Sequence, residues 1–391
     1  MRNLVLLDPD GGRNRPLWFV RLALVIWIFC IPATAEAQAQ LTLDAAFSEA
    51  FGMVGPLREL SDGRVMVADP LGQVLAVIDF GSGQADTLGR VGGGPREYRQ
   101  PDGVYPLAGD TTLLVDLGNA RLTTIGPQGQ FGNTYPMAQE TASGGMVVAL
   151  PQGVDRAGRL YFRSEAQPMG AYPDSAALLR FDPTTRVLDT LALLKVPELP
   201  PPPLPGGGGP RGKAAEPQDD WAVDQDGRVA IIRSESYALE RFSPGAGWMT
   251  GPVNDYEAVR IRDAEKEMWL AEQAGASVRM ASDETGTVSV FRSGEGGDRD
   301  VMNLYDWPRA FPAVKPGRAM LAPNGEAWVE RYVAAGEPPL VDRFDERGRR
   351  IGELRLPENR RIGGFGAGVV YLVRTDDFGL QWIERYRWRF E

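Results

Sequence analysis

The chain has 391 residues, of which 43% are hydrophobic and 24% are charged, so it can bury a large core. Its formal net charge is -10, and the field of such a chain repels a long polyanion, which argues against nucleic-acid binding. The sequence contains no histidine, which excludes Ser-His-Asp and Cys-His catalysis and also zinc or haem held by histidine.

The N-terminal segment has the features of an export signal. Arginines lead into an apolar run at residues 22–31, and two A-x-A cleavage patterns follow within residues 35–39. The single cysteine, Cys30, lies in this segment, so the exported chain would have neither a disulfide nor a thiol nucleophile. We expect residues 1–39 to be a signal peptide and the protein to be periplasmic or extracellular, without an integral membrane span after cleavage. The alternative is that the apolar run is kept as a membrane anchor.

One pattern recurs along the rest of the chain. A turn with glycine leads into a strand of alternating apolar residues, and a short loop leads into a second strand that ends in another turn. The glycine turns with their following strands lie at residues 62–69, 109–116, 157–165, 226–236, 324–332 and 367–377.

A further strand precedes each glycine turn, and another follows each pair of strands. Repeats of about 40 to 50 residues with four strands each are typical of a β-propeller. The sequence therefore predicts an all-β fold, a six-bladed β-propeller of four-stranded antiparallel blades over residues 40–391. The last copy ends after three strands, near Trp388, and residues 41–47 (LTLDAAF) can supply its outer strand. Pairing the two ends in this way closes the ring and removes open sheet edges.

Two regions depart from the repeat. Residues 196–213 (VPELPPPPLPGGGGPRGK) form a Pro/Gly-rich segment that we interpret as a loop between strands; the alternative is a docking site for a proline-recognising partner. Residues 255–316 are predicted to be an insertion between blades four and five. This insertion contains the best helix candidate, AEKEMWLAEQ, and a glycine turn with one strand at residues 285–292 that lacks the next strand of the repeat.

The crossing after the first blade resembles those of the NHL-repeat and TolB-like six-bladed propellers. In those families a G-x-G-x-x-x-(F/Y)-x-x-P crossing leads into an inner strand, and a D-x-x-N-x-R turn joins the second and third strands. The matching residues here are Gly92, Gly94, Tyr98, Pro101, Asp116, Asn119 and Arg121. Only the second blade shows both motifs clearly.

The resemblance implies a scaffold and little about a reaction. Some six-bladed relatives are metal-dependent lactonases, and others are lyases or dehydrogenases that use histidine, which this chain lacks. A calcium-type lactonase needs a Glu, an Asn and Asp residues that converge in the central channel. That activity stays open on composition alone.

Arginine marks one position once the blades are aligned. The second strand ends in arginine in four blades, and two more arginines lie in the first crossing, on the same predicted face. Guanidinium groups around one face suit a carboxylate or phosphate ligand. The structural alternative is that each arginine pairs with an acidic neighbour such as Glu165, Glu235, Glu330 or Asp376. The candidate ligand-face residues are Arg96, Arg99, Arg163, Arg233, Arg331 and Arg374.

The sequence thus favours an exported, non-catalytic propeller scaffold that binds a small anionic ligand or an envelope or extracellular protein. No catalytic residue, cofactor ligand or metal ligand is predicted. The alternative function is a divalent-metal-dependent hydrolase of the lactonase type, with Ca²⁺ held by carboxylates in the central channel.

Overall fold

A computed structural model describes residues 40–164, 174–197, 211–276, 278–282, 288–292 and 299–389, all within one compact unit, Glu36–Glu391. The predicted signal peptide and most of the predicted Pro/Gly-rich loop lie outside the described residues.

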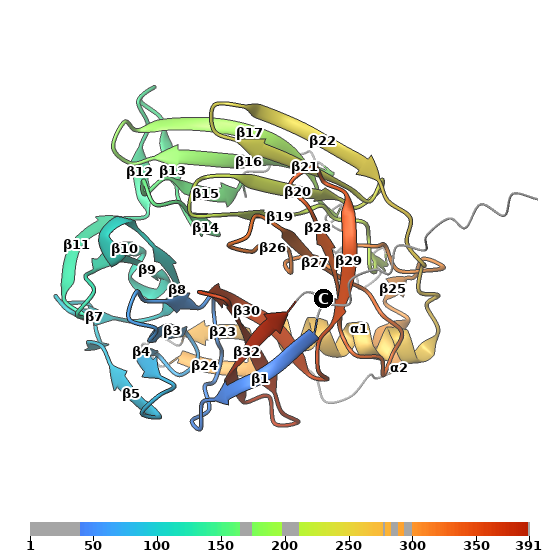
Figure 1. Cartoon of the computed structure of the whole chain (residues 1–391), viewed down its shortest axis with the longest axis horizontal. Helices are drawn as coiled ribbons and strands as arrows, with labels where there is room; N and C mark the ends of the chain where they lie inside the picture. The colour runs from blue at the N-terminus through green and yellow to red at the C-terminus, as the bar shows by residue number, and fades with distance from the viewer. Residues whose placement is uncertain are drawn as a thin grey trace, which may run out of the picture. The chain divides into compact units, whose positions relative to one another are not determined.

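Six four-stranded antiparallel sheets form the fold, and in each the strands pair side by side in a meander (Figure 1). Blade 1 contains β2 (Arg58–Glu59), β3 (Val65–Asp69), β4 (Val74–Asp79) and β5 (Gln84–Thr87). Blade 2 contains β8 (Pro101–Pro106), β9 (Thr112–Asp116), β10 (Arg121–Ile125) and β11 (Phe131–Pro136). Blade 3 contains β14 (Gly153–Val154), β15 (Leu160–Arg163), β16 (Ser175–Asp182) and β17 (Val187–Lys195).

The remaining blades repeat this order. Blade 4 contains β19 (Asp220–Val223), β20 (Val229–Arg233), β21 (Ala238–Ser243) and β22 (Gly247–Val253). Blade 5 contains β26 (Met320–Leu321), β27 (Ala327–Arg331), β28 (Leu340–Phe344) and β29 (Arg350–Arg355). Blade 6 contains β30 (Arg360–Gly366), β31 (Val369–Thr375) and β32 (Gln381–Arg389), followed by β1 (Gln40–Ala46).

The predicted six-bladed propeller and its closure by an N-terminal strand are confirmed. β1 pairs antiparallel with β32, from Gln40 opposite Arg389 to Ala46 opposite Glu384. Asp44 of β1 accepts hydrogen bonds from Arg385 at 2.7 Å and from Arg387 at 2.8 Å, which adds two ion pairs to the junction. The glycine turns behave as expected, since Gly63 and Gly325 both have φ of 85°, a conformation that disfavours residues with a Cβ.

Apolar side chains pack between neighbouring blades rather than around one centre. Trp328 of blade 5, which is fully buried, lies in one cluster with Leu372 and Tyr386 of blade 6. Buried phenols add polar contacts at these interfaces: the Tyr98 hydroxyl accepts a hydrogen bond from the Leu75 amide at 3.1 Å, and the Tyr237 hydroxyl donates to Asp342. Each blade is therefore held on both of its faces.

Smaller elements occupy the crossings. β6 (Arg90–Val91) pairs in parallel with β7 (Glu97–Tyr98), β12 (Ala138–Glu140) forms a hairpin with β13 (Met146–Val148), and β18 (Gly212–Lys213) pairs with β25 (Tyr305–Asp306). Short 3₁₀ turns lie at Ala108–Asp110 and Leu117–Asn119. Between blades 4 and 5 the chain forms α1 (Asp263–Ala276), the hairpin β23 (Val278–Ser282) and β24 (Val288–Arg292), and α2 (Arg299–Met302).

The helix candidate in the insertion is therefore helical, and the strand near residue 288 pairs in a separate hairpin instead of a seventh blade. Lys315 fixes α1 to blade 5, because its ammonium lies 2.8 Å from Glu272 and 3.1 Å from Glu330. In the described part of the chain, no helix is long and apolar enough to cross a membrane.

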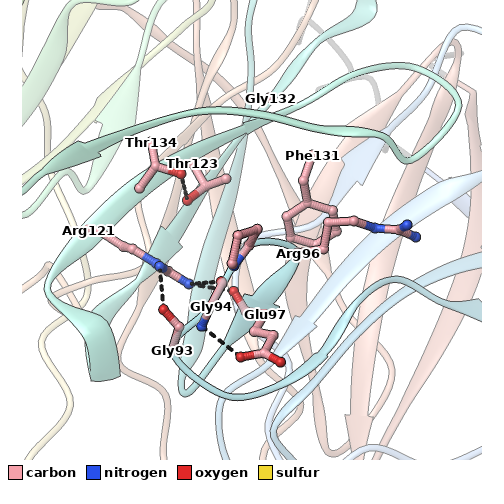
Figure 2. A pocket seen from close by; sticks show the side chains of 10 residues that line it. Gly93, Gly94, Arg96, Glu97, Arg121, Thr123, Phe131, Gly132 and Thr134 are labelled. Carbon is pink, nitrogen blue, oxygen red and sulfur yellow. Dashed lines mark hydrogen bonds between the residues drawn. The ribbon is translucent and has the colours of Figure 1, made fainter.

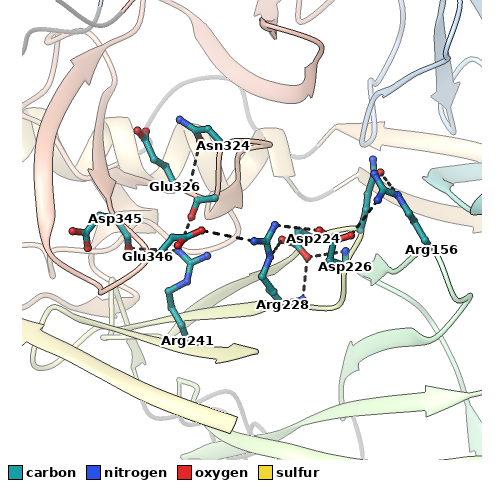
Figure 3. Close-up of polar contacts among 11 residues, drawn as sticks. Arg156, Asp224, Asp226, Arg228, Arg241, Asn324, Glu326, Asp345 and Glu346 are labelled. Carbon is teal, nitrogen blue, oxygen red and sulfur yellow. Dashed lines mark hydrogen bonds and ion pairs between the residues drawn. The ribbon is translucent and has the colours of Figure 1, made fainter. Parts of the chain in front are cut away.

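The antiparallel order gives the propeller two unlike faces. The loop face carries the connections between second and third strands and the crossings between blades, which include α1 and the β12–β13 hairpin. The turn face carries the tight turns within blades, and the tip of the β12–β13 hairpin reaches it, where the Ala142 amide donates to the Arg186 carbonyl at 2.7 Å. Ion pairs join these turns across blades, with Arg156 of blade 3 lying 3.1 Å from Asp226 of blade 4 and Arg228 of blade 4 lying 3.8 Å from Glu346 of blade 5 (Figure 3).

Replacing Asp220 with alanine is expected to lower the free energy of unfolding by at least about 2 kcal/mol. The Asp220 carboxylate is 5% exposed and accepts the backbone N–H groups of Arg318 at 2.8 Å and Ala319 at 2.6 Å, so it joins blade 4 to blade 5. Alanine would leave both donors unpaired in the interface. Chemical denaturation measures the change, with Asp377→Ala, an exposed position, expected to stay within about 0.5 kcal/mol of the parent. Equal effects of the two variants would contradict the assignment.

Glu384 gives the closing blade an acid-sensitive component. The Arg360 guanidinium donates to it through two hydrogen bonds of 2.9 Å. Burial alone would raise the pKa of Glu384, but hydrogen bonds from Arg360 and Tyr386 and the nearby positive charges hold it below the ordinary 4.5. A lowered carboxyl pKa contributes stability that is present above 4.5 and is lost as the pH falls through the folded-state value.

We expect Glu384→Gln to destabilise the protein more at pH 7 than at pH 3, because the parent loses the charge effect in acid while the variant has none to lose. Urea denaturation at both pH values measures the difference. A destabilisation that is the same at both pH values would show that the charge of Glu384 does not contribute.

Candidate functional site

The four predicted arginines at second-strand ends lie where expected on the loop face. Arg163, Arg233 and Arg331 are the last residues of β15, β20 and β27, and Arg374 is the second-last of β31. In a four-stranded antiparallel meander these ends and the crossings lie on one side, so Arg96 and Arg99 share the same face. Their role in ligand binding stays a prediction.

Three of these guanidinium groups already have carboxylate partners. Arg233 lies 2.8 Å from Asp219 and 2.6 Å from Glu240. Arg331 is mostly buried and lies 3.0 Å from the fully buried Asp342. Arg374 lies 3.2 Å from Glu384, and its guanidinium carbon is 4.3 Å from the centre of the Trp382 ring. These contacts hold strands together and leave less of each group for a ligand.

The partners differ from the sequence neighbours that were considered for them. Glu235 pairs with Lys195 at 2.9 Å, and Glu330 pairs with Lys315. The physical reason is the strand period: Glu330 and Arg331 are consecutive in β27, so their side chains point to opposite faces of the sheet. Arginine instead reaches a carboxylate on a neighbouring strand, as Arg331 does with Asp342 of β28.

The residues of the crossing between blades 1 and 2 hydrogen-bond to the turn between β9 and β10. The Asp116 carboxylate accepts the Arg99 amide at 3.0 Å and lies 3.0 Å from Nε of Arg121. Arg121 also donates to the carbonyls of Gly93 at 3.1 Å and Glu97 at 2.6 Å (Figure 2). The residues that carry the family resemblance therefore fix the turn and the crossing to each other.

A hollow of about 330 Å³ lies beside this crossing, between the glycine segment and β10–β11. Arg96 lines it, is exposed, and extends beside Phe131 away from Arg121 (Figure 2). The Glu97 carboxylate accepts the Gly94 amide at 2.6 Å, and Arg121 is engaged by carbonyls. The hollow thus gathers mainly groups that already have partners.

A different pair of arginines lies on the loop face, at the starts of innermost strands and therefore nearer the centre of the propeller. Arg318 lies two residues before β26, and Arg361 is the second residue of β30, so both are at the loop-face ends of innermost strands in adjacent blades. We call these two residues the inner-rim pair. Neither forms an ion pair with a carboxylate in the part of the chain that the structure describes.

The environment of Arg361 is unusual for a guanidinium. It donates to the carbonyl of Val54 and, at 3.4 Å, to the side-chain oxygen of Gln381, both of which are uncharged. Burial and the positive charge of Arg318 lower the pKa of Arg361 to about 10, whereas the negative charge of Glu330 acts in the opposite direction. The charge of Arg318 thus acts on Arg361, and among the described residues neither guanidinium has a carboxylate within ion-pair distance.

The inner-rim pair was not predicted from the sequence, because the arginines that were compared lie at the ends of second strands and in the first crossing. The signal was available: aligning the innermost strands of blades 5 and 6 places Arg318 and Arg361 at their starts. What the sequence could not show is that neither has a carboxylate across the neighbouring strand, since that depends on the blade-to-blade register.

A metal centre finds no support at this face. Among the described residues, no group of three or more Asp, Glu, His or Cys side chains could hold a metal ion. Asp102 lies at the start of the inner strand β8, and burial raises its pKa.

No protein-family model matches the chain, and no curated protein matches it significantly. Among solved structures it is similar to a member of the DUF4221 family from Bacteroides vulgatus, with 10% identity, a TM-score of 0.49, and coverage of 91% of this chain and 100% of that one. A protein from Bacteroides fragilis described as exported has 11% identity and a TM-score of 0.46, covering 91% and 96%. A gluconolactonase from Xanthomonas campestris has 12% identity and a TM-score of 0.40, covering 91% and 93%. At such low identity, the similarity says nothing of the activity of this chain.

Proposed function

We propose that the protein is an exported, non-catalytic propeller that binds a small anionic ligand on its loop face. The observation that carries this proposal is the inner-rim pair: Arg361 donates only to uncharged oxygens of Val54 and Gln381, the charge of Arg318 acts on it, and neither arginine forms an ion pair with a carboxylate in the described structure. The N-terminal leader pattern supports export. The crossing and turn motifs of blade 2 support a relationship to the NHL-repeat and TolB-like propellers.

A partly buried cation without a counter-ion costs free energy, and a second cation beside it increases the cost. A carboxylate or phosphate that reaches both guanidinium groups would offset that cost through charge-assisted, bidentate hydrogen bonds. The outer arginines Arg233, Arg331 and Arg374 keep the surrounding strands in place through their own carboxylates.

Non-catalytic binding fits the described residues better than hydrolysis. The chain has no histidine, and its described carboxylates do not converge into a metal site. An acidic side chain of an envelope or extracellular protein would present the same carboxylate as a small ligand, so the chemistry of recognition is shared.

A thermal-shift titration tests the proposal with citrate and inorganic phosphate as anions. An anion that binds only the folded state, at about 100 times its dissociation constant, stabilises the protein by about 2.7 kcal/mol. We expect the parent to be stabilised by at least one anion, and we expect the double variant Arg318→Gln, Arg361→Gln to lose this response. The exposed turn-face variant Arg347→Gln is the matched control and should respond like the parent.

Calcium with EDTA reversal forms the second arm of the same experiment. A stabilisation by Ca²⁺ that EDTA reverses, with no response to anions, would replace the proposal with a metal-dependent activity. An anion response that is the same in the parent and in the double variant would move the site away from the inner-rim pair.

A further inference from the structure

The turn face contains a second hollow, of about 260 Å³, between blades 4 and 5. Two registered pairs of blade 4 show which side chains face it together. Arg241 of β21 lies opposite Met249 of β22, and Ser243 lies opposite Gly247, so these residues belong to one face of the sheet. Glu346, from the turn after β28, forms the opposite wall. This hollow lies on the other face of the propeller from the inner-rim pair.

Arg241 is the unusual member of this hollow. The residue is 4% exposed, and one of its terminal nitrogens donates to the Gly325 carbonyl of blade 5 at 2.8 Å. No carboxylate of the described structure lies within ion-pair distance of it. Burial lowers the pKa of Arg241, the charge of Arg228 adds to this effect, and the charge of Glu346 opposes it. The Arg241 guanidinium therefore lies in the interface between blades 4 and 5 without a carboxylate in direct contact.

Two charged side chains near Arg241, those of Arg228 and Glu346, contact other charged groups. Arg228 lies 2.6 Å from Asp224, and Glu346 reaches Arg228 only at 3.8 Å (Figure 3). Ser243 adds a hydroxyl next to Arg241 on the same strand face. Met249, which is 41% exposed, and Ala246 add apolar surface. The hollow combines the buried guanidinium of Arg241 and the hydroxyl of Ser243 with an apolar wall that includes Met249, and the charged side chains of Arg228 and Glu346 also line it.

We infer that this hollow binds a small organic carboxylate, with the carboxylate on Arg241 and Ser243 and the carbon skeleton against Met249. The planar guanidinium matches a carboxylate through parallel N–H···O hydrogen bonds. A hollow of about 260 Å³ suits a small organic acid no larger than a monosaccharide acid. The negative charges of Glu346, Asp224 and Asp345, which all act on Arg241, disfavour a doubly charged phosphate more than a monocarboxylate.

Methyl NMR of the protein labelled at methionine tests this inference directly, because the Met249 methyl group lies at the proposed site. The Met249→Leu variant assigns its resonance. Acetate and glucuronate should each shift the Met249 signal in a saturable way, whereas glucose, which matches glucuronate except for the carboxylate, should not. Arg241→Gln is expected to weaken the binding at least about tenfold, since a hydrogen bond to a charged group is lost.

Ser243→Glu serves as the second variant. It supplies an internal carboxylate two residues from Arg241 on the same strand face, so it should abolish ligand binding while it keeps or raises the thermal midpoint. Arg309→Gln, at an exposed position in the insertion, should bind like the parent.

The inference would be overturned if no carboxylate moved the Met249 signal, or if the shift persisted unchanged in Ser243→Glu. A shift by inorganic phosphate as strong as that by acetate would overturn the choice of a carboxylate. The inner-rim variants Arg318→Gln and Arg361→Gln should leave the Met249 response unchanged, so the two sites can fail independently.

Discussion

Pairing of the first described strand with the last one is the constraint on which the rest of this molecule depends. The hydrogen bonds between β1 and β32, supported by Asp44 with Arg385 and Arg387, complete the fourth strand of blade 6. Blade 6 can then pack against blade 1, where the Tyr371 hydroxyl meets Glu59. Without β1, blade 6 would present β32 as an open edge, and its contact with blade 1 would lose support.

Closure of the ring also fixes which connections between strands lie on each of the two faces. The meander within each blade sends every crossing and every connection between second and third strands to the loop face, and the other turns to the turn face. Ion pairs between blades tie the turns together, as Arg156 and Asp226 do. The loop face holds the larger insertions, the usual place for binding residues on a rigid scaffold.

Much of the architecture could be predicted because each blade repeats local signals. Glycine turns such as Asn324-Gly325 and short apolar runs such as Ala327-Trp328-Val329 of β27 specify strands within a few residues of where they lie. The insertion was harder: the strand near residue 288 carries the same turn signal as a blade strand, and only its pairing with β23 shows that it belongs to a hairpin. The structure supplies that long-range pairing.

The candidate site was less predictable for a related reason. Local sequence shows that an arginine ends a strand, but whether it is available depends on the strand beside it. Arg331 forms ion pairs with Asp342 and Glu353, whereas Arg361 meets only uncharged oxygens of Val54 and Gln381. Cross-strand and cross-blade register decide which arginines pair with a carboxylate and which do not, and register between blades leaves no local trace in the sequence.

The junction of β1 with β32 also has a consequence for the timing of folding. Asp44 and Arg385 are 341 positions apart along the chain, so this contact cannot form until almost the whole polypeptide is available. Five blades can assemble from neighbouring segments, but the sixth must recruit a strand from the opposite end, at a large entropic cost of loop closure. Until that step, the chain holds two unsatisfied sheet edges. Ring closure is therefore expected to be the slow step, and the interval before it is the time at which this protein is most exposed to aggregation.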